Sequence, residues 1–154
     1  MLTVVSGGQT GVDRAALDAA RALGLPCRGW CPRGRRAEDG PIDPVYPLAE
    51  TPDEDYSQRT EWNVRDSDGT LVLSRGRPKG GTAFTISVAR RLRRPLLVVD
   101  LGEAPAPDEA RRWIEAEAIA VLNVAGPRES QQPGIGGEAR AFLERLFRLT
   151  STRG

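Results

Sequence analysis

LTVVSGGQTGVDRAALDAARALGLP, the stretch from residue 2 to residue 26, places a short apolar run before a glycine-rich turn and a helical pattern. Leu2–Val5 has the length and β-branched content of a buried strand. Thr10 and Asp13 match the capping-box pattern that opens a helix, and Gly24 is a typical residue at a helix end. The stretch therefore predicts a strand, a glycine turn and a helix in succession.

The remainder of the chain repeats this alternation. Strands are predicted at residues 28–30, 70–73, 96–99 and 119–124, helices over 57–65, from Thr82, from Pro107 and over 139–147, and loops over 33–56 and 125–137. Continuous apolar runs of this kind are typical of strands buried on both faces of a parallel sheet. We therefore predict an α/β fold, with a doubly wound, mostly parallel sheet, helices on both faces and a single domain over residues 1–154.

Composition and charge exclude several classes of function. Lys and Arg number 22 against 21 Asp and Glu, a balance that argues against a dedicated nucleic-acid protein. The sequence has no histidine, and Cys27 and Cys31 alone cannot complete a zinc site, so we expect no protein-ligated metal. The two cysteines are interpreted as free thiols of a cytoplasmic protein, and the absence of a long apolar run predicts no membrane association.

The first glycine-rich loop is predicted to bind an anion. It contains Ser6, Gly7, Gly8, Gln9 and Thr10. Glycines let the backbone approach a ligand closely, and the following helix directs free N–H groups and its positive dipole end at an anion. A tight turn would also favour glycine, so a purely structural role stays open. A dinucleotide site is disfavoured, because Ser6 replaces the first glycine of G-x-G-x-x-G.

A second candidate anion-binding loop runs from Arg75 to Thr82; such a loop is called a cradle below. Gly80 and Gly81 precede the predicted helix, which Thr82 is expected to cap. Thr82 stands where a nucleotide-triphosphate loop has lysine, so the pattern favours a phosphate or oxyanion cradle of another kind. Arg75 would add positive charge. The alternative is a helix cap beside a solvated basic loop.

The third loop follows the last predicted strand. Arg128 could form two parallel hydrogen bonds with a phosphate or carboxylate, and Glu129 could orient Arg128 or bind a ligand hydroxyl. A flexible surface loop would have the same spacing, so this alternative stays open. Because all three loops connect a strand to a helix, we expect them to open on the same edge of the sheet, where such folds bind ligands.

Several longer segments carry a resemblance to known proteins. They are residues 6–20, 29–42, 60–68, 80–83 and 123–130. They resemble the molybdenum carrier family, also described as a circularly permuted YpsA-like branch of the SLOG superfamily. The resemblance implies a Rossmann-like sheet that binds molybdenum cofactor as cargo, or a nucleotide, in a homo-oligomeric protein that serves molybdoenzymes. In this comparison Gly7–Thr10 match the first cradle of the family, and Gly80–Thr82 match the second.

The leading hypothesis is therefore a carrier of a small anionic ligand. Backbone N–H groups of the two cradles would hold the anionic groups of the ligand, and Arg128 would close over it. Trp30 or Trp62 could stack on a pterin or purine ring. A single-stranded nucleic-acid binder is the least favoured alternative, because the chain has a neutral charge balance and few aromatic residues.

The main alternative is a LOG-like phosphoribohydrolase of nucleoside monophosphates, or a nucleotide sensor. The related enzymes have a catalytic glutamate shortly after their glycine–threonine turn. Here the first glutamate after Thr82 is Glu103, which puts hydrolase activity in doubt. Asp13, Glu61 or Glu129 would have to replace the absent carboxylate.

Overall fold

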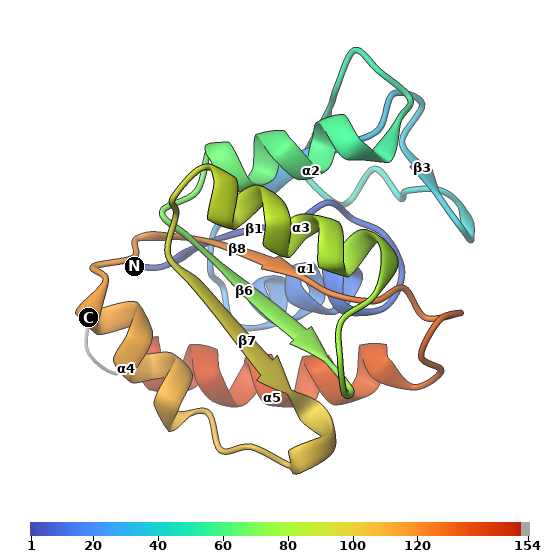
Figure 1. Ribbon diagram of the computed structural model, residues 1–154. Coiled ribbons are helices and arrows are strands. Elements are labelled where there is room, and N and C mark those ends of the chain that lie inside the picture. The colour runs from blue at the N-terminus through green and yellow to red at the C-terminus, as the bar shows by residue number, and fades with distance from the viewer. Residues whose placement is uncertain (152–154) are drawn as a thin grey trace.

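Six parallel strands form the central sheet of the computed structural model, which describes residues 1–151. In spatial order they are β5 (Leu48–Glu50), β2 (Cys27–Cys31), β1 (Thr3–Val5), β8 (Val121–Ala125), β6 (Gly69–Ser74) and β7 (Leu96–Asp100) (Figure 1). Every neighbouring pair runs parallel. The predicted parallel α/β sheet is thus confirmed.

Helices cover both faces of this sheet, as the doubly wound prediction requires. On one face lie α1 (Val12–Ala22), α4 (Asp108–Ala116) and α5 (Ile135–Ser151), and on the other lie α2 (Tyr56–Arg65) and α3 (Gly80–Arg91) (Figure 1). The smaller elements are a 3-10 helix, η1 (Leu101–Glu103), and an antiparallel pair of short strands, β3 (Arg36–Ala37) and β4 (Gly40–Pro41). Among the described residues, no helix has the length and apolar character that crossing a membrane requires.

Separate apolar clusters hold the helices on the two faces. Four side chains of α5 recur at helical spacing and are buried against β1, β6 and β8: Phe142, Leu143, Leu146 and Phe147. On the other face, Val64 of α2 packs against Val88 and Ala89 of α3. Burial on both faces fixes the three-layer arrangement, because each helix must remove its apolar stripe from water.

Part of the chain predicted as loop is ordered into regular structure. Residues 33–56 contain the β3–β4 pair and β5, which extends the sheet beside β2. β5 was not predicted because it has only three residues, of which Leu48 alone is buried. Similarly, α5 begins at Ile135, within the segment 125–137 that the sequence predicts as loop, since Ile135 is fully buried in the core.

Two predicted helix caps are wrong. Gly11 occupies the cap position of α1, and no side chain there bonds to the first turn. The Thr10 hydroxyl instead donates to the Glu38 carboxylate and accepts from the backbone N–H of Glu129. Thr82 lies inside the first turn of α3 and does not precede it. In α1, contacts with distant segments decide which residue caps the helix, and local spacing does not encode them.

Gly11→Ala is expected to lower the free energy of unfolding by at least about 2 kcal/mol. Gly11 has φ 78°, and a Cβ there would lie 2.3 Å from the carbonyl oxygen of Pro127. Gly24→Ala is the matched control, since Gly24 has φ 71° but no atom within 4 Å of the added Cβ. Urea unfolding should show a clearly smaller loss for the control. Equal losses would mean that the contact with Pro127 is unimportant.

Candidate functional site

A pocket of about 250 Å³ lies at the carboxyl ends of the central strands. The chain leaves β1 toward α1 on one face of the sheet and leaves β6 toward α3 on the other, with β8 between them. This divergence is the switch point at which parallel α/β sheets bind ligands. Its walls come from the loop after β1, from α2, from the start of α3 and from the segment after β8.

The first turn of α3 opens into this pocket with free hydrogen-bond donors. Lys79 precedes the helix without capping it, and the first turn contains no acidic residue. The backbone N–H groups of Thr82 and Ala83 bond to the Lys79 carbonyl, whereas within the described chain those of Gly80 and Gly81 have no acceptor. Both glycines are exposed at the pocket wall. The turn therefore presents uncompensated N–H groups and the positive end of a helix dipole.

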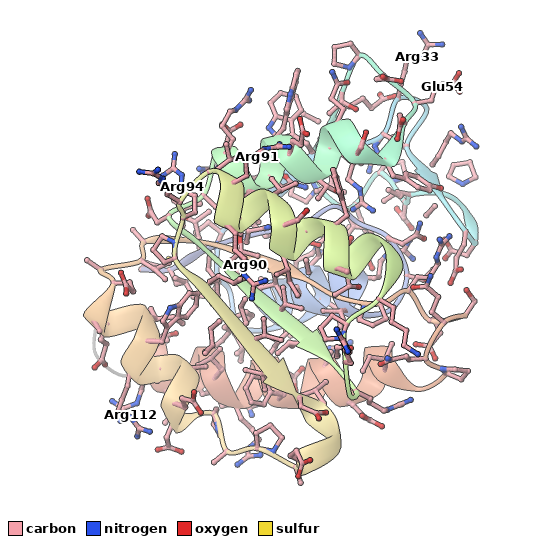
Figure 2. All side chains as sticks on the ribbon, in the orientation of Figure 1. Arg33, Glu54, Arg90, Arg91, Arg94 and Arg112 are labelled. Carbon is pink, nitrogen blue, oxygen red and sulfur yellow. The ribbon has the colours of Figure 1, made fainter. Side chains whose placement is uncertain are left out.

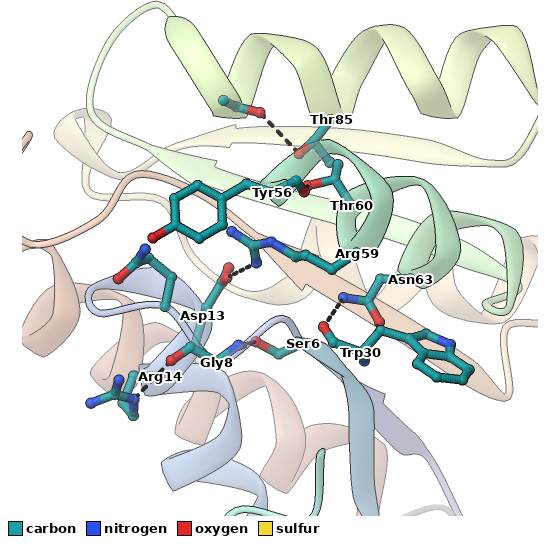
Figure 3. A network of polar contacts seen from close by, with 12 residues as sticks. Ser6, Gly8, Asp13, Arg14, Trp30, Tyr56, Arg59, Thr60, Asn63 and Thr85 are labelled. Carbon is teal, nitrogen blue, oxygen red and sulfur yellow. Dashed lines mark hydrogen bonds and ion pairs between the residues drawn. The ribbon is translucent and has the colours of Figure 1, made fainter. Parts of the chain in front are cut away.

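A mostly buried ion pair forms another wall of the pocket. Arg59 reaches from α2 to Asp13 at the start of α1, and its Nη1 lies 2.8 Å from Asp13 Oδ2 (Figure 3). The two side chains are only 14% and 6% exposed. Arg59 Nε is buried without a hydrogen-bond partner. The guanidinium therefore has donor capacity left beside the pocket.

Gly7 makes room for this arginine. A Cβ on Gly7 would lie 1.7 Å from Arg59 Nη1. The sequence predicts that Gly7 lets a ligand approach the backbone, whereas the structure places the Arg59 guanidinium against Gly7.

Burial raises the pKa of Asp13, and the neighbouring Arg59 partly opposes that rise.

The structure brings together six of the residues that the sequence proposes for ligand binding. Those that line the pocket are Gly7, Gln9, Gly80, Gly81, Thr82 and Arg128. The sequence did not single out several other polar residues of its walls, among them Arg59 and Thr85. Arg59 is 46 positions from Asp13, and no spacing in the sequence links the two. Only the packing of α2 over the loop after β1 reveals their pairing.

Five residues that the sequence proposes for binding do not line the pocket. Two of them, Ser6 and Gly8, stabilise the conformation of the first loop. The Ser6 hydroxyl donates to the backbone carbonyl of Asp13 at 2.8 Å, which ties the end of β1 to the start of α1. Gly8 has φ 81°, and a Cβ there would lie 2.5 Å from a methyl group of Leu48. Both residues therefore shape the loop and do not line the pocket.

The other three are Thr10, already described, Arg75 and Glu129. Arg75 pairs with Glu138 at 2.8 Å and lines a separate depression with Arg77 and Lys79. The Glu129 carboxylate accepts the backbone N–H groups of Gly134 and Gly136 at 2.5 and 3.0 Å, at the start of α5. In this arrangement Glu129 stabilises a helix N-terminus, as carboxylates do, and does not orient Arg128.

The two tryptophans proposed for stacking contact each other. Trp30 and Trp62 form an edge-to-face pair with ring centroids 4.7 Å apart, and neither lines the pocket. Asn63 bonds through its side chain to both the N–H and the carbonyl of Trp30, at 2.8 and 3.0 Å. These contacts fasten α2 to β2, and so they hold Arg59 in position over the pocket.

Glu38 joins the rims of the first and third loops. Its carboxylate accepts from the Thr10 hydroxyl and from both the N–H and the hydroxyl of Ser130. Gln9 accepts the backbone N–H of Glu38 at 2.8 Å. The hydrogen bonds from Ser130 and Thr10 lower the pKa of Glu38. The β3–β4 turn therefore braces the two loops beside the pocket.

Metal ligation by the protein has no candidate site in residues 1–151. No group of three or more His, Cys, Asp or Glu side chains is placed to hold a metal ion there. Cys27 and Cys31 are both free, and Cys31 is buried. The donor groups that line the pocket are amides, hydroxyls and guanidinium groups, which suit an anion.

Comparisons with known proteins show which family the chain resembles. A family model described as the "Circularly permutated YpsA SLOG family" matches residues 4–147. Among solved structures, the chain is similar to the "Putative molybdenum carrier protein" of Syntrophus aciditrophicus SB, with a TM-score of 0.90 and 44% sequence identity. The similarity covers 95% of this chain and 94% of the other. A comparison with curated proteins finds no match.

Proposed function

The chain belongs to the circularly permutated YpsA SLOG family, and from this premise we propose that it is a carrier of molybdenum cofactor. The anionic end of the cofactor would occupy the pocket between β1, β8 and the start of α3. The observation that carries the proposal is the uncapped first turn of α3, which opens beside Arg59 and Arg128. A relative of nearly equal length bears the name "Putative molybdenum carrier protein", which supports a ligand that contains molybdenum.

The charge of the pocket favours an anion. Arg59 and Arg128 are its cationic side chains, and Asp13 is its single carboxylate. The free N–H groups of Gly80 and Gly81 add the partial positive charge of a helix N-terminus. A phosphate or an oxo-metal group could accept hydrogen bonds from the N–H groups of Gly80 and Gly81, which lack acceptors in the described structure.

The size of the pocket indicates how much of the ligand it would hold. Its volume of about 250 Å³ is below the usual range of roughly 300–1,000 Å³ for pockets that enclose a whole small molecule. The pocket therefore suits the anionic end of the cofactor, with the pterin lying toward the rim near Gln9 and Gln131. The sulfur ligands of the metal belong to the cofactor itself, so the carrier would hold molybdenum without coordinating it.

A nucleoside monophosphate is the second candidate ligand, and the position of Asp13 favours it. Of the carboxylates considered for hydrolysis, Glu129 bonds at the start of α5 and Glu61 pairs with Arg91 at 2.9 Å. Asp13 alone lines the pocket, and burial raises its pKa, as it does for many carboxyl groups that act in proton transfer. Its pairing with Arg59 would have to loosen before it could act on a substrate.

Calorimetric titration with three ligands tests the proposal. Molybdenum cofactor under anaerobic conditions, AMP and molybdate are each added to the protein, and free adenine is measured in the AMP sample. We expect saturable one-to-one binding of the cofactor and much weaker binding of AMP. Adenine release, or tighter binding of AMP than of the cofactor, would mean that the ligand is a nucleoside monophosphate and that the protein is not a carrier of molybdenum cofactor. Binding of molybdate alone, or of none of the three, would overturn the assignment to the cofactor.

A further inference from the structure

A second depression lies beside the candidate pocket, and cationic residues line it. Its volume is about 530 Å³, and its walls come from the loop between β6 and α3 and from the segment that follows β8. Gln131 lines both the depression and the pocket. A Cβ on Gly80 would lie 3.9 Å from Gln131 Nε2, so this side chain lies beside the first turn of α3. The depression and the pocket are therefore neighbours at the same end of the helix.

The side chains that line this depression carry positive charge. Arg75, Arg77 and Lys79 line it, and no carboxylate does. Arg75 is already paired, because its Nη2 lies 2.8 Å from Glu138 Oε1. None of the salt bridges within residues 1–151 includes Arg77 or Lys79, and both residues are exposed. Two cations therefore lie beside the pocket without a salt-bridge partner in the described chain.

Hydrogen bonds at the base of the loop between β6 and α3 hold it in place. Gln132 Oε1 accepts the backbone N–H of Arg75 at 2.9 Å, and Gln132 Nε2 donates to the carbonyl of Arg75 at 3.0 Å. Asp100 Oδ1 accepts the backbone N–H of Gly76 at 2.8 Å. These bonds use only backbone groups of the loop. The two unpaired cationic side chains are therefore available to a ligand, and an ordered backbone positions them.

The two unpaired cations lie where a helix least favours positive charge. The N-terminus of a helix carries partial positive charge, so acidic residues stabilise it and cationic residues destabilise it. α3 has no acidic residue in its first turn, and Lys79 occupies the position before that turn. Arg77 lies two residues further upstream. An arrangement that costs local stability is expected at a functional site, where a ligand supplies the compensating charge.

We propose that this depression is a second anion site, and that the ligand of the protein is an ester of diphosphate. The proposal rests on the proposed function, in which Gly80 and Gly81 hold the first anionic group. Lys79 directly precedes Gly80, and Gln131 lines both hollows, so two phosphates that share a bridging oxygen would contact both. Arg77 and Lys79 would bind the second phosphate, whose charge would compensate theirs.

Two kinds of ligand have this chemistry. One is a nucleoside diphosphate, and the other is molybdenum cofactor joined to a nucleoside through a diphosphate. Titration with ADP and with the nucleotide-linked cofactor distinguishes them. Tighter binding of the nucleotide-linked cofactor than of the free cofactor and of ADP is the result expected of a carrier. Tighter binding of ADP would identify the diphosphate ester as a nucleotide.

Calorimetric titration with inorganic phosphate and with pyrophosphate, without divalent metal ions, tests the second site. The unmodified protein should bind pyrophosphate at least about tenfold more tightly than phosphate, because only pyrophosphate reaches both sites. The double variant Arg77→Gln with Lys79→Gln should weaken pyrophosphate binding at least about tenfold and phosphate binding less than about threefold. Both replaced side chains are exposed, so the fold should be unaffected.

Arg90→Gln with Arg112→Gln is the matched control, because it also removes two positive charges. Both residues are exposed, Arg90 in the last turn of α3 and Arg112 on α4. Figure 2 shows both of them away from the start of α3. This variant should keep the preference for pyrophosphate. A loss equal to that of the double variant at Arg77 and Lys79 would mean that net charge, and not a second site, decides the affinity.

Thermal unfolding without ligand gives an independent readout. Because Arg77 and Lys79 lie at the positive end of the α3 dipole, their replacement by glutamine should raise the melting temperature by about 2 °C. The control at Arg90 and Arg112 should not raise it. A double variant that is no more stable than the unmodified protein would contradict the argument from the helix dipole, on which the proposal depends.

The titrations separate this proposal from the function on which it rests. If phosphate binds but pyrophosphate is not preferred, the second anion site is wrong and the site at Gly80 and Gly81 stands. The same holds if the double variant at Arg77 and Lys79 keeps the preference. If neither anion binds, the proposed anion site at the start of α3 is wrong as well.

Discussion

Gly81→Asp is expected to abolish binding of the anionic ligand and to leave the fold intact. Gly81 lies in the uncapped first turn of α3, and a Cβ there meets no atom within 4 Å. The carboxylate would occupy the place of the ligand anion, and like-charge contact should weaken binding at least about a hundredfold. An acidic residue in the first turn of a helix is itself stabilising, so the melting temperature should stay equal or rise slightly.

Gly81→Asn is the control for this variant. It adds a side chain of nearly the same size without the charge, so it should retain most of the affinity. Calorimetric titration with molybdenum cofactor measures both proteins, and thermal unfolding measures their stability. Unchanged affinity in G81D would exclude the α3 N-terminus as the anion site. An equal loss in both variants would show that steric blocking, not charge, is responsible.

Arg59→Met is expected to lower the free energy of unfolding by about 3–5 kcal/mol at neutral pH, because it leaves the Asp13 carboxylate buried without its partner. Ligand affinity should fall as well, since Arg59 lines the pocket. Urea unfolding measures the stability loss. The control is the double variant Asp13→Asn with Arg59→Met, which removes the unpaired charge and should recover most of the stability without recovering ligand binding.

The loss in R59M should depend on pH in a defined direction. Burial already raises the pKa of Asp13, and removing Arg59 takes away the attraction that opposes the rise. A carboxyl whose pKa is raised by folding favours the folded state below its ordinary pKa, and this contribution is lost as the pH rises through the folded value. The difference between R59M and the unmodified protein should therefore shrink toward acidic pH. A difference that is constant with pH would contradict the buried-carboxylate explanation.

The fold was accessible from the sequence because each part of it has a local signature. The strands around Val4, Val72 and Val98 are apolar runs between turn residues, and α5 has a clear helical repeat. These patterns require only the period of the backbone and the burial of apolar side chains. β5 escaped prediction because its pairing with β2 is set by the sheet and not by its own three residues.

The candidate site was accessible only in outline. Parallel topology brings glycine loops to one edge, which is why Gly7, Gly80 and Gly81 meet in the pocket. The side chains around them were less predictable. Arg59 enters from α2, and Glu129 bonds at the start of α5, because of contacts between distant segments. Sequence spacing carries no information about such contacts.

The place of β8 also determines when the molecule can be completed during synthesis. It is the last strand within residues 1–151, yet it lies between β1 and β6. Until residue 125 has left the ribosome, the sheet consists of two halves with unpaired inner edges, a form that is prone to aggregation. One wall of the pocket, Asn123–Gly126, belongs to the end of β8 and the residue after it. A nascent chain therefore completes its candidate site and its sheet late in synthesis.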